Sequence, residues 1–186
     1  MDVEETTLPG VLVIQPDVFG DERGHFLETY RRERYAEAGI GPLAEQDNLS
    51  FSERGVLRGL HLQNPMQQAK LCQALVGEVF DVAADVRVGS PTFGEWVGVT
   101  LSAESRRQLY IPAGFAHGFC ALSETALFSY KCSERYAPET ELTIRWDDPT
   151  LAIEWPMAEP LVSAKDAAGL RLDELAEGRL PTYDAG

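Results

Sequence analysis

Basic residues are scarce in this sequence. Its 186 residues include 16 lysines and arginines against 30 aspartates and glutamates, which gives a formal net charge of −14. A protein that binds DNA or RNA needs a basic face to displace condensed counterions, so this charge argues against nucleic acid as a partner. The acidity indicates a soluble surface. Any anionic substrate would have to bind where the few basic side chains are concentrated.

Long apolar runs and a signal-like N-terminus are also missing. No run approaches the ~20 residues that cross a bilayer, and Met1–Glu5 is acidic, with no apolar core. We therefore expect no membrane partner and a cytoplasmic location. The three cysteines, Cys72, Cys120 and Cys132, form no C-x-x-C pair and lie in apolar runs, which predicts small buried thiols.

Repeats, linkers and long helical segments are absent too. The length suits one domain, and we expect a single domain over residues 1–186. Residues 31–38, followed by Gly39, predict one short surface helix, and further helical turns are expected from Asp166 onward. Parallel sheets need long helical crossovers, for which the sequence has no room.

What the sequence does contain is alternation at period two, mainly between residues 45 and 146. Residues 78–87, 97–101 and 125–132 are the clearest strands, and turns rich in glycine and proline separate them. In the first strand, apolar side chains share one face while Asp81 and Asp85 point the other way, which is typical of a half-buried strand. Many short strands at this spacing indicate a sandwich, a jelly roll or a closed barrel.

Histidine is rare, and two of the three histidines lie in strand-like surroundings. These are His61 and His117, whereas His25 follows a glycine in a turn and is expected to be exposed. A lone histidine on a strand is more often a hydrogen-bonded structural residue than a catalyst. Function therefore depends on what surrounds each one.

The stretches Gly55–His61 and Pro112–His117 resemble the two motifs of the cupin family. Metal-binding cupins add a second histidine two residues on and a glutamate shortly after, where this chain has Gln63, Gln67 and Gln68. Two histidines fall short of the three protein ligands that a catalytic metal normally needs. We expect an all-β, cupin-type jelly-roll barrel with a few short peripheral helices and no metal.

Two histidines in a barrel without metal suggest acid/base chemistry. Histidine titrates near pH 6.5, as a general base requires, and Tyr130, on the same face as Phe128, is a proton donor at pH 7. Lys70 alternates with apolar residues, so it either meets an anion such as an enolate or lies at the barrel mouth with its stem buried. Strict alternation places Arg58 opposite His61, unless a bulge intervenes.

A string of motifs resembles the dTDP-4-dehydrorhamnose 3,5-epimerase family over roughly residues 8 to 168. Each piece is weak alone, but their number and order make chance an inadequate explanation. The motifs are Asp21–Gly24 with Phe26 and Glu28, Gln46–Asn48, Val56–His61, Gly89–Gly94, Ile111–Phe119, Tyr130–Lys131, Tyr136–Pro138, Trp146–Pro149 and Ser163–Asp166.

The resemblance implies a role for each matching catalytic residue. His61 corresponds to the proton acceptor, and Asp166 to the carboxylate that orients it. Tyr130 corresponds to the proton donor on the opposite face of the sugar, Lys70 to the cation near the keto oxygen, and His117 to a further substrate contact.

The resemblance also implies a nucleotide-binding set and a partner subunit. Tyr136 corresponds to the aromatic ring that stacks on thymine. In the family, Arg23 and its neighbours reach the site of a partner, so a homodimer is implied. The positions that match the substrate, nucleotide and diphosphate contacts are Arg23, Phe26, Glu28, Gln46, Asp47, Asn48, Arg58, Glu141 and Lys165.

The expected function is therefore cofactor-independent conversion of dTDP-4-keto-6-deoxy-D-glucose to dTDP-4-keto-L-rhamnose. The 4-keto group acidifies the protons on carbons 3 and 5, so a base, an acid across the ring and a cation at the oxygen suffice. Alternatives on the same scaffold are a 3-epimerase and a 3,4-ketoisomerase. A metal-dependent cupin oxygenase and a non-catalytic sugar-nucleotide binding module are alternatives of other classes.

Overall fold

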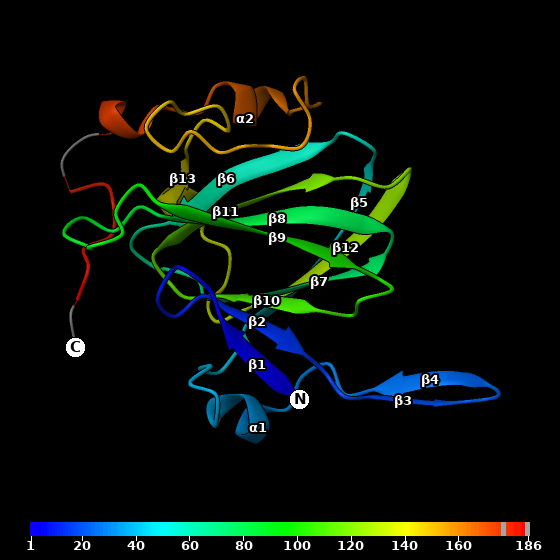
Figure 1. The fold of residues 1–186 in the computed structure, drawn as a ribbon. Helices are drawn as coiled ribbons and strands as arrows, with labels where there is room; N and C mark the ends of the chain where they lie inside the picture. The colour runs from blue at the N-terminus through cyan, green and yellow to red at the C-terminus, as the bar shows by residue number, and fades with distance from the viewer. Residues whose placement is uncertain (176–177, 185–186) are drawn as a thin grey trace.

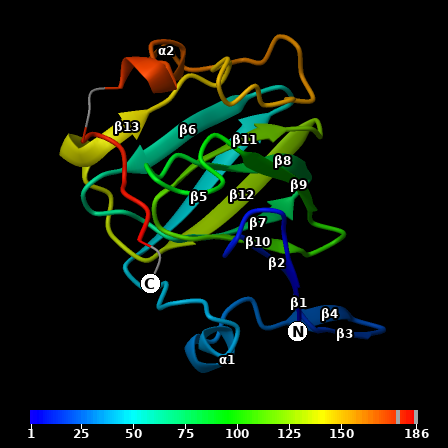
Figure 2. The same cartoon turned by 60° about the vertical axis from the view of Figure 1, so that its left-hand side comes forward.

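The computed structural model describes residues 1–175 and 178–184, and strands dominate it (Figures 1 and 2). The helical elements are α1 (Arg32–Ala36), α2 (Ala164–Ala167) and the 3-10 turns Pro138–Thr140 and Leu172–Glu174. The strands are β1 (Asp2–Glu5), β2 (Leu12–Gln15), β3 (Val18–Asp21), β4 (Gly24–Leu27), β5 (Gln46–Glu53), β6 (Leu57–Gln63), β7 (Lys70–Val76), β8 (Glu78–Asp85), β9 (Trp96–Ser102), β10 (Gln108–Ile111), β11 (Phe115–Ala121), β12 (Thr125–Cys132) and β13 (Glu141–Thr143).

Two antiparallel sheets face each other and form the barrel. One sheet has the order β1-β2-β10-β7-β12-β5, and the other has the order β13-β6-β11-β8-β9. The short β3–β4 hairpin forms a third sheet that projects away from the barrel (Figure 1). This arrangement confirms the predicted cupin-type jelly roll.

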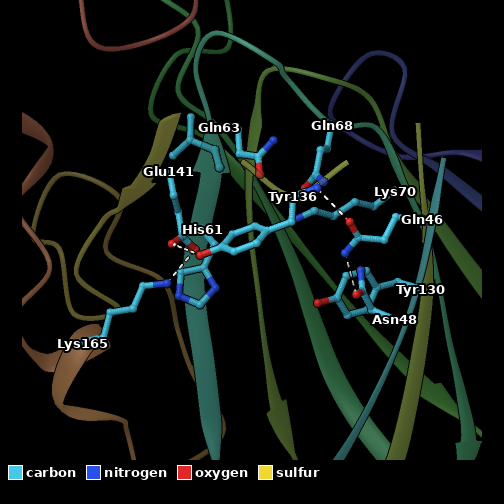
Figure 3. A pocket seen from close by; sticks show the side chains of 11 residues that line it. Gln46, Asn48, His61, Gln63, Gln68, Lys70, Tyr130, Tyr136, Glu141 and Lys165 are labelled. Carbon is cyan, nitrogen blue, oxygen red and sulfur yellow. Dashed lines mark hydrogen bonds and ion pairs between the residues drawn. The ribbon is translucent and has the colours of Figure 1, made fainter. Parts of the chain in front are cut away.

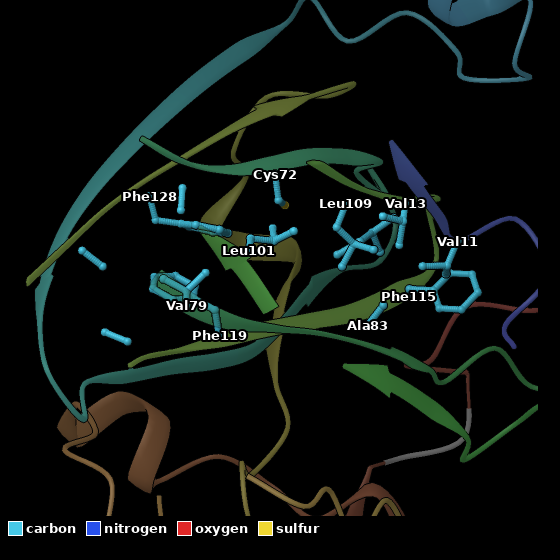
Figure 4. Close-up of a cluster of buried hydrophobic side chains, with 14 of the residues drawn as sticks. Val11, Val13, Cys72, Val79, Ala83, Leu101, Leu109, Phe115, Phe119 and Phe128 are labelled. Carbon is cyan, nitrogen blue, oxygen red and sulfur yellow. The ribbon is translucent and has the colours of Figure 1, made fainter. Parts of the chain in front are cut away.

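The main apolar core fills the space between the two sheets (Figure 4). Phe119 and Phe128, from opposite sheets, pack with ring centroids 4.2 Å apart. The inward face of β12 carries the apolar residues that its alternation predicted, and Tyr130 packs against this core. Burial of an apolar side chain of this size stabilises the fold by about 2 kcal/mol. The core therefore keeps the two sheets packed together.

The prediction that β8 is half-buried is wrong, because both of its faces are covered. Its apolar face packs against the C-terminal segment, as the edge-to-face contact of Phe80 with Trp155 shows. The opposite face, with Val79, Asp81 and Asp85, points into the barrel, and both carboxylates are fully buried. Two acidic side chains in a closed interior require specific partners.

Two outer layers cover the sheets and carry part of the site. The segment after β13 crosses the outer face of the five-stranded sheet and brings α2 beside β6 (Figures 1 and 2). On the other sheet, α1 covers the outer face through Tyr35, and Gly39 follows it with a φ of 78°. The helix expected from Asp166 onward begins earlier, at Ala164, because the Ser163 side chain caps it.

All three cysteines are buried free thiols, and His25 is exposed, as expected. Among the described residues, no helix is long and apolar enough to span a membrane.

Candidate active site

Two adjoining cavities of about 310 and 480 Å³ open at one end of the barrel. His61, Lys70, Tyr130 and Lys165 line both cavities, so they define a continuous site between the sheets and α2. The first cavity, shown in Figure 3, is also lined by Gln46, Asn48, Leu62, Gln63, Gln68, Tyr136 and Glu141. The second is also lined by Ser50, Val56, Leu57, Arg58, His117, Phe119, Leu161, Val162, Ser163 and Asp166.

The histidine at the centre of the site pairs with the carboxylate expected from the sequence. His61 Nε2 lies 2.6 Å from Asp166 Oδ1, although 105 residues separate them. Asp166 is held by α2, where its amide donates to the Ser163 hydroxyl. Burial alone would raise the pKa of Asp166, but hydrogen bonds from His61 and Ser163 outweigh burial and lower that pKa. The charged carboxylate therefore accepts the Nε2 proton and leaves Nδ1 of His61 with a free lone pair.

A bulge at Gly59 explains how Arg58 and His61 reach the same cavity. Opposite β11, His61 pairs with His117 while Arg58 pairs with Phe119, so the register shifts between them. A Cβ atom on Gly59 would lie 2.6 Å from the Cα of Gly118, and its φ is 126°, so only glycine fits. The chain therefore has the bulge that was predicted as the alternative to strict alternation.

Tyr130 and Lys70 lie on the neighbouring strands β12 and β7. Burial raises the pKa of Tyr130 to about 12, which keeps its hydroxyl protonated at neutral pH. Lys70 is only 8% exposed, and its Nζ lies 5.9 Å from the centre of the Tyr130 ring. Burial lowers the pKa of Lys70, and the Asp81 carboxylate is among the groups that oppose that shift. A donor and a cation therefore share one wall of the cavity.

The other histidine of the site, His117, is buried and belongs to a hydrogen-bonded cluster behind Lys70. Its Nε2 lies 2.7 Å from Asp81 Oδ1, and its Nδ1 lies 3.4 Å from Lys70 Nζ. Sequence reasoning missed Asp81 as a site residue, because alternation placed it on the polar face of a half-buried strand. The signal available was Ala83, a small apolar residue between Asp81 and Asp85 on that face.

Cys72, Asp81 and His117 could in principle hold a metal, since each offers one ligand atom and all three atoms lie within 4.8 Å. The 2.7 Å separation of His117 Nε2 and Asp81 Oδ1 is, however, a hydrogen-bond length. The Lys70 ammonium beside them also disfavours a divalent ion. These residues fit a proton-bearing network better than a metal centre.

The positions where metal-binding cupins carry further ligands have a structural use here. Gln63 is buried, and its amide nitrogen donates to the carbonyls of Met66 and Arg135. Its amide oxygen accepts from the Ala137 amide. Gln68 donates to the Glu134 carbonyl at 2.7 Å. Both glutamines therefore fasten the loop before β7 to the loop after β12.

The mouth of the site carries an ion pair and an aromatic ring (Figure 3). Glu141 accepts from Lys165 at 2.6 Å and from the Tyr136 hydroxyl at 2.9 Å. Gln46 accepts from the Tyr136 amide and donates to Asn48, which fixes both polar side chains on β5. The exposed ring and the amide groups form a surface suited to a planar base.

Four residues of the expected binding set lie outside these cavities within one chain. Arg23 and Phe26 lie on the projecting β3–β4 hairpin, and Arg23 pairs with Asp21. Glu28 follows that hairpin and pairs with arginines in or beside α1. Asp47 lies on the outer face of β5, paired with Lys131. The other eleven predicted site residues line the two cavities.

Residues 5–174 match the family described as dTDP-4-dehydrorhamnose 3,5-epimerase. A dTDP-4-dehydrorhamnose 3,5-epimerase of Shigella flexneri is 54% identical over 172 residues, which cover 91% of this chain and 94% of the relative. A dTDP-4-dehydrorhamnose 3-epimerase of Streptomyces niveus is 47% identical over 179 residues, or 95% and 86% of the two chains.

A solved structure is similar over nearly the whole length. The crystal structure of dTDP-6-deoxy-D-glucose-3,5-epimerase from Legionella pneumophila Philadelphia 1, in complex with dTDP-4-keto-L-rhamnose, is 50% identical. Its TM-score is 0.96, and the match covers 99% of each chain.

Proposed function

The chain belongs to the dTDP-4-dehydrorhamnose 3,5-epimerase family, and we propose that it converts dTDP-4-keto-6-deoxy-D-glucose to dTDP-4-keto-L-rhamnose. The observation that carries the proposal is the His61–Asp166 pair, which opens into a cavity shared with Tyr130 and Lys70. The four groups supply a base with its orienting carboxylate, an acid and a cation. Inverting a carbon next to a ketone needs this combination.

The proposed reaction follows the same steps at carbon 3 and at carbon 5. His61 takes the proton, and the C–H electron pair forms the enolate, with its negative charge on the keto oxygen. Lys70 stabilises that oxygen. Tyr130 donates its hydroxyl proton to the opposite face, which inverts the carbon. Solvent then returns a proton to the tyrosinate and takes one from His61, so the cycle balances without an oxidant or a cofactor.

The open end of the site is proposed to hold the nucleotide. The exposed ring of Tyr136 is suited to stacking on the thymine base, flanked by the amide groups of Gln46 and Asn48. Arg58 and Lys165 are the cations available for the diphosphate. They concentrate positive charge at the site of a chain whose net charge is −14.

A homodimer is proposed because the chain leaves two apolar surfaces uncovered. Phe19 and Phe26 on the β3–β4 hairpin are 63% and 71% exposed. Strand β5 ends its sheet, and Leu49 and Phe51 on its outer face are about as exposed. Pairing with a second copy would bury these side chains and remove an open sheet edge. The hairpin would then bring Arg23 into the partner's site.

We also propose that the chain forms one domain and that it is cytoplasmic. A single barrel domain over residues 1–186 is supported by the continuous core and by the C-terminal layer that completes the site. A cytoplasmic location is supported by the three free thiols, which suit a reducing compartment.

Turnover of the dTDP-sugar tests the proposed function. NMR should show conversion of dTDP-4-keto-6-deoxy-D-glucose to the L-configured product by the wild-type protein. His61→Ala should retain dTDP affinity within a few-fold and lose turnover, which separates an enzyme from a binding module. Wild-type-like turnover in that variant would contradict the assigned base. Stoichiometric iron in the purified protein, together with loss of activity on chelation, would favour the oxygenase alternative.

Complementation tests the dimer. His61→Ala and Arg23→Ala chains should each be inactive, and mixing them should restore about a quarter of wild-type activity, since half of the dimers are mixed and each holds one intact site. No recovery on mixing, with monomers seen by sedimentation, would refute the shared site.

A further inference from the structure

We propose that Asp81 is a positioning residue for this reaction, which acts through His117 to hold Lys70 as an ammonium group at the substrate's ketone oxygen. The inference rests on the proposed epimerase function and deepens it, because it assigns a task to a buried carboxylate that the acid/base mechanism leaves unused.

Three side chains, two from neighbouring strands of one sheet and the third from the facing sheet, form a continuous hydrogen-bonded series. Asp81 Oδ1 on β8 lies 2.7 Å from His117 Nε2 on β11, and His117 Nδ1 lies 3.4 Å from Lys70 Nζ on β7. Asp81 is fully buried, His117 is 5% exposed and Lys70 is 8% exposed. Because water hardly reaches these three groups, solvent screens the interactions between them only weakly.

The pairing fixes the tautomer of the imidazole. A carboxylate only accepts, so the ring proton must lie on Nε2, and Nδ1 is left as an acceptor. An acceptor at Nδ1 faces the Lys70 ammonium, which only donates. Burial lowers the pKa of His117; the Asp81 charge opposes this shift and the Lys70 charge adds to it, so the net direction favours a neutral ring between the two ions.

The charges balance only when Lys70 keeps its proton. Asp81 Oδ2 has no hydrogen-bond partner in the part of the chain that the structure describes. A buried carboxylate with an unpaired oxygen needs a nearby cation, since an isolated charge is very costly in a closed interior. Lys70, across the ring of His117, provides that cation. In turn, Asp81 opposes the loss of the Lys70 proton that burial favours.

Other titratable groups also surround Lys70 and set the background for this effect. These groups are Cys72 on β7, Cys132 and Tyr130 on β12, His61 on β6 and Glu141 on β13. Of these, Cys72, Cys132 and Tyr130 are neutral at pH 7, because burial raises the pKa of each. Asp81 is therefore the buried anion that is joined to Lys70 through a defined donor and acceptor.

The test compares Asp81→Asn with Asp85→Asn over a pH range. Asparagine can still accept the His117 proton through its oxygen, so it removes the charge and keeps the shape. Asp85 is a matched control, since it is equally buried on the same face of β8 but pairs with Arg87, Ser90 and Thr92. Both the pH profile of kcat and the affinity for dTDP are measured.

We expect the alkaline limb of the Asp81→Asn profile to move at least one pH unit lower, with dTDP affinity within about threefold of wild type. Asp85→Asn should lower Tm and leave the profile in place. An Asp81→Asn profile that coincides with wild type would overturn the inference.

A measurement on the wild-type protein covers the case in which the variant does not fold. ¹⁵N NMR of the imidazoles should show His117 protonated at Nε2 and unprotonated at Nδ1 across the active pH range. An Nδ1-protonated or doubly protonated ring would overturn the inference. Failure of the proposed epimerase function would be distinguishable from failure of this inference, because the wild-type protein would then not turn over the dTDP-sugar.

Discussion

The site contains two histidine–aspartate pairs that are nearly identical in length and different in surroundings. His61 and Asp166 are 2.6 Å apart, and His117 and Asp81 are 2.7 Å apart. The histidines are even register partners on the adjacent strands β6 and β11. His61, however, opens to the cavity with 29% of its side chain exposed, whereas that of His117 is 6% exposed.

The difference shows how one pair of residue types can perform two tasks. The His61–Asp166 pair lines the cavity, so the Nδ1 atom of His61 can take a proton from a substrate there. The Nδ1 atom of His117 instead faces the Lys70 ammonium. The open pair is therefore suited to proton transfer, and the closed pair is suited to holding a cation in place.

The largest expected effect comes from removing the base of the open pair. His61→Asn keeps a polar side chain of similar size but cannot take up a proton, so kcat should fall by roughly 10³- to 10⁴-fold. Binding of dTDP, measured by calorimetry, should change little, because the nucleotide is proposed to lie at the mouth. A loss of less than tenfold would show that another group is the base.

The carboxylate of the open pair should matter less than the base itself. Asp166→Asn removes the charge that orients His61 and stabilises the imidazolium, so kcat should fall by roughly 10²- to 10³-fold. Single-turnover kinetics would measure this loss, and Tm would show that α2 remains docked. An unchanged kcat would mean that the 2.6 Å contact is only structural.

Tyr130 separates proton removal from inversion. Tyr130→Phe should slow formation of the inverted product by about 10- to 100-fold, because the opposite face loses its donor. Deuterium exchange from solvent, catalysed by His61 on one face, should fall less than inversion does. NMR follows both in one experiment. If exchange and inversion fell in parallel, Tyr130 would not be the distinct second acid.

The closed pair, His117 and Asp81, should make the stability of the protein depend modestly on pH. Burial lowers the pKa of His117, so below about pH 6.5 the unfolded chain binds a proton that the folded chain does not. Tm should therefore fall as pH drops from 7 to 5, and His117→Gln should remove part of that slope, on the order of a few degrees. The exposed His25→Gln is the control, and equal slopes in both variants would contradict this assignment.

The fold was largely predictable because alternation is a local signal. Strands β9 and β12 appear where the period-two pattern places them, and Tyr130 lies on the face shared with Phe128. The direction of β8 was misjudged for a reason that alternation cannot reveal. Its apolar face meets the C-terminal segment, where Trp155 packs on Phe80 from 75 residues later in the chain, so the face with Asp81 became the interior.

The catalytic set was predictable through the motifs, whereas its arrangement depended on long-range contacts. The 105-residue separation of His61 and Asp166 is closed by α2, and nothing local in either segment shows it. The alternation of β6 placed Arg58 and His61 on opposite faces until the Gly59 bulge shifted the register. The role of Asp81 required the three-dimensional position of Lys70, which lies on the facing sheet of the barrel.

The most direct test is hydrogen exchange at the substrate's own carbons. The wild-type protein is incubated with dTDP-4-keto-6-deoxy-D-glucose in D2O, and deuterium is followed at carbons 3 and 5 by NMR. Incorporation at both carbons, lost in His61→Asn, is the result that the proposed mechanism predicts. Exchange at carbon 3 alone would restrict the protein to 3-epimerisation or ketoisomerisation. No exchange at either carbon, with dTDP still bound, would contradict the central claim.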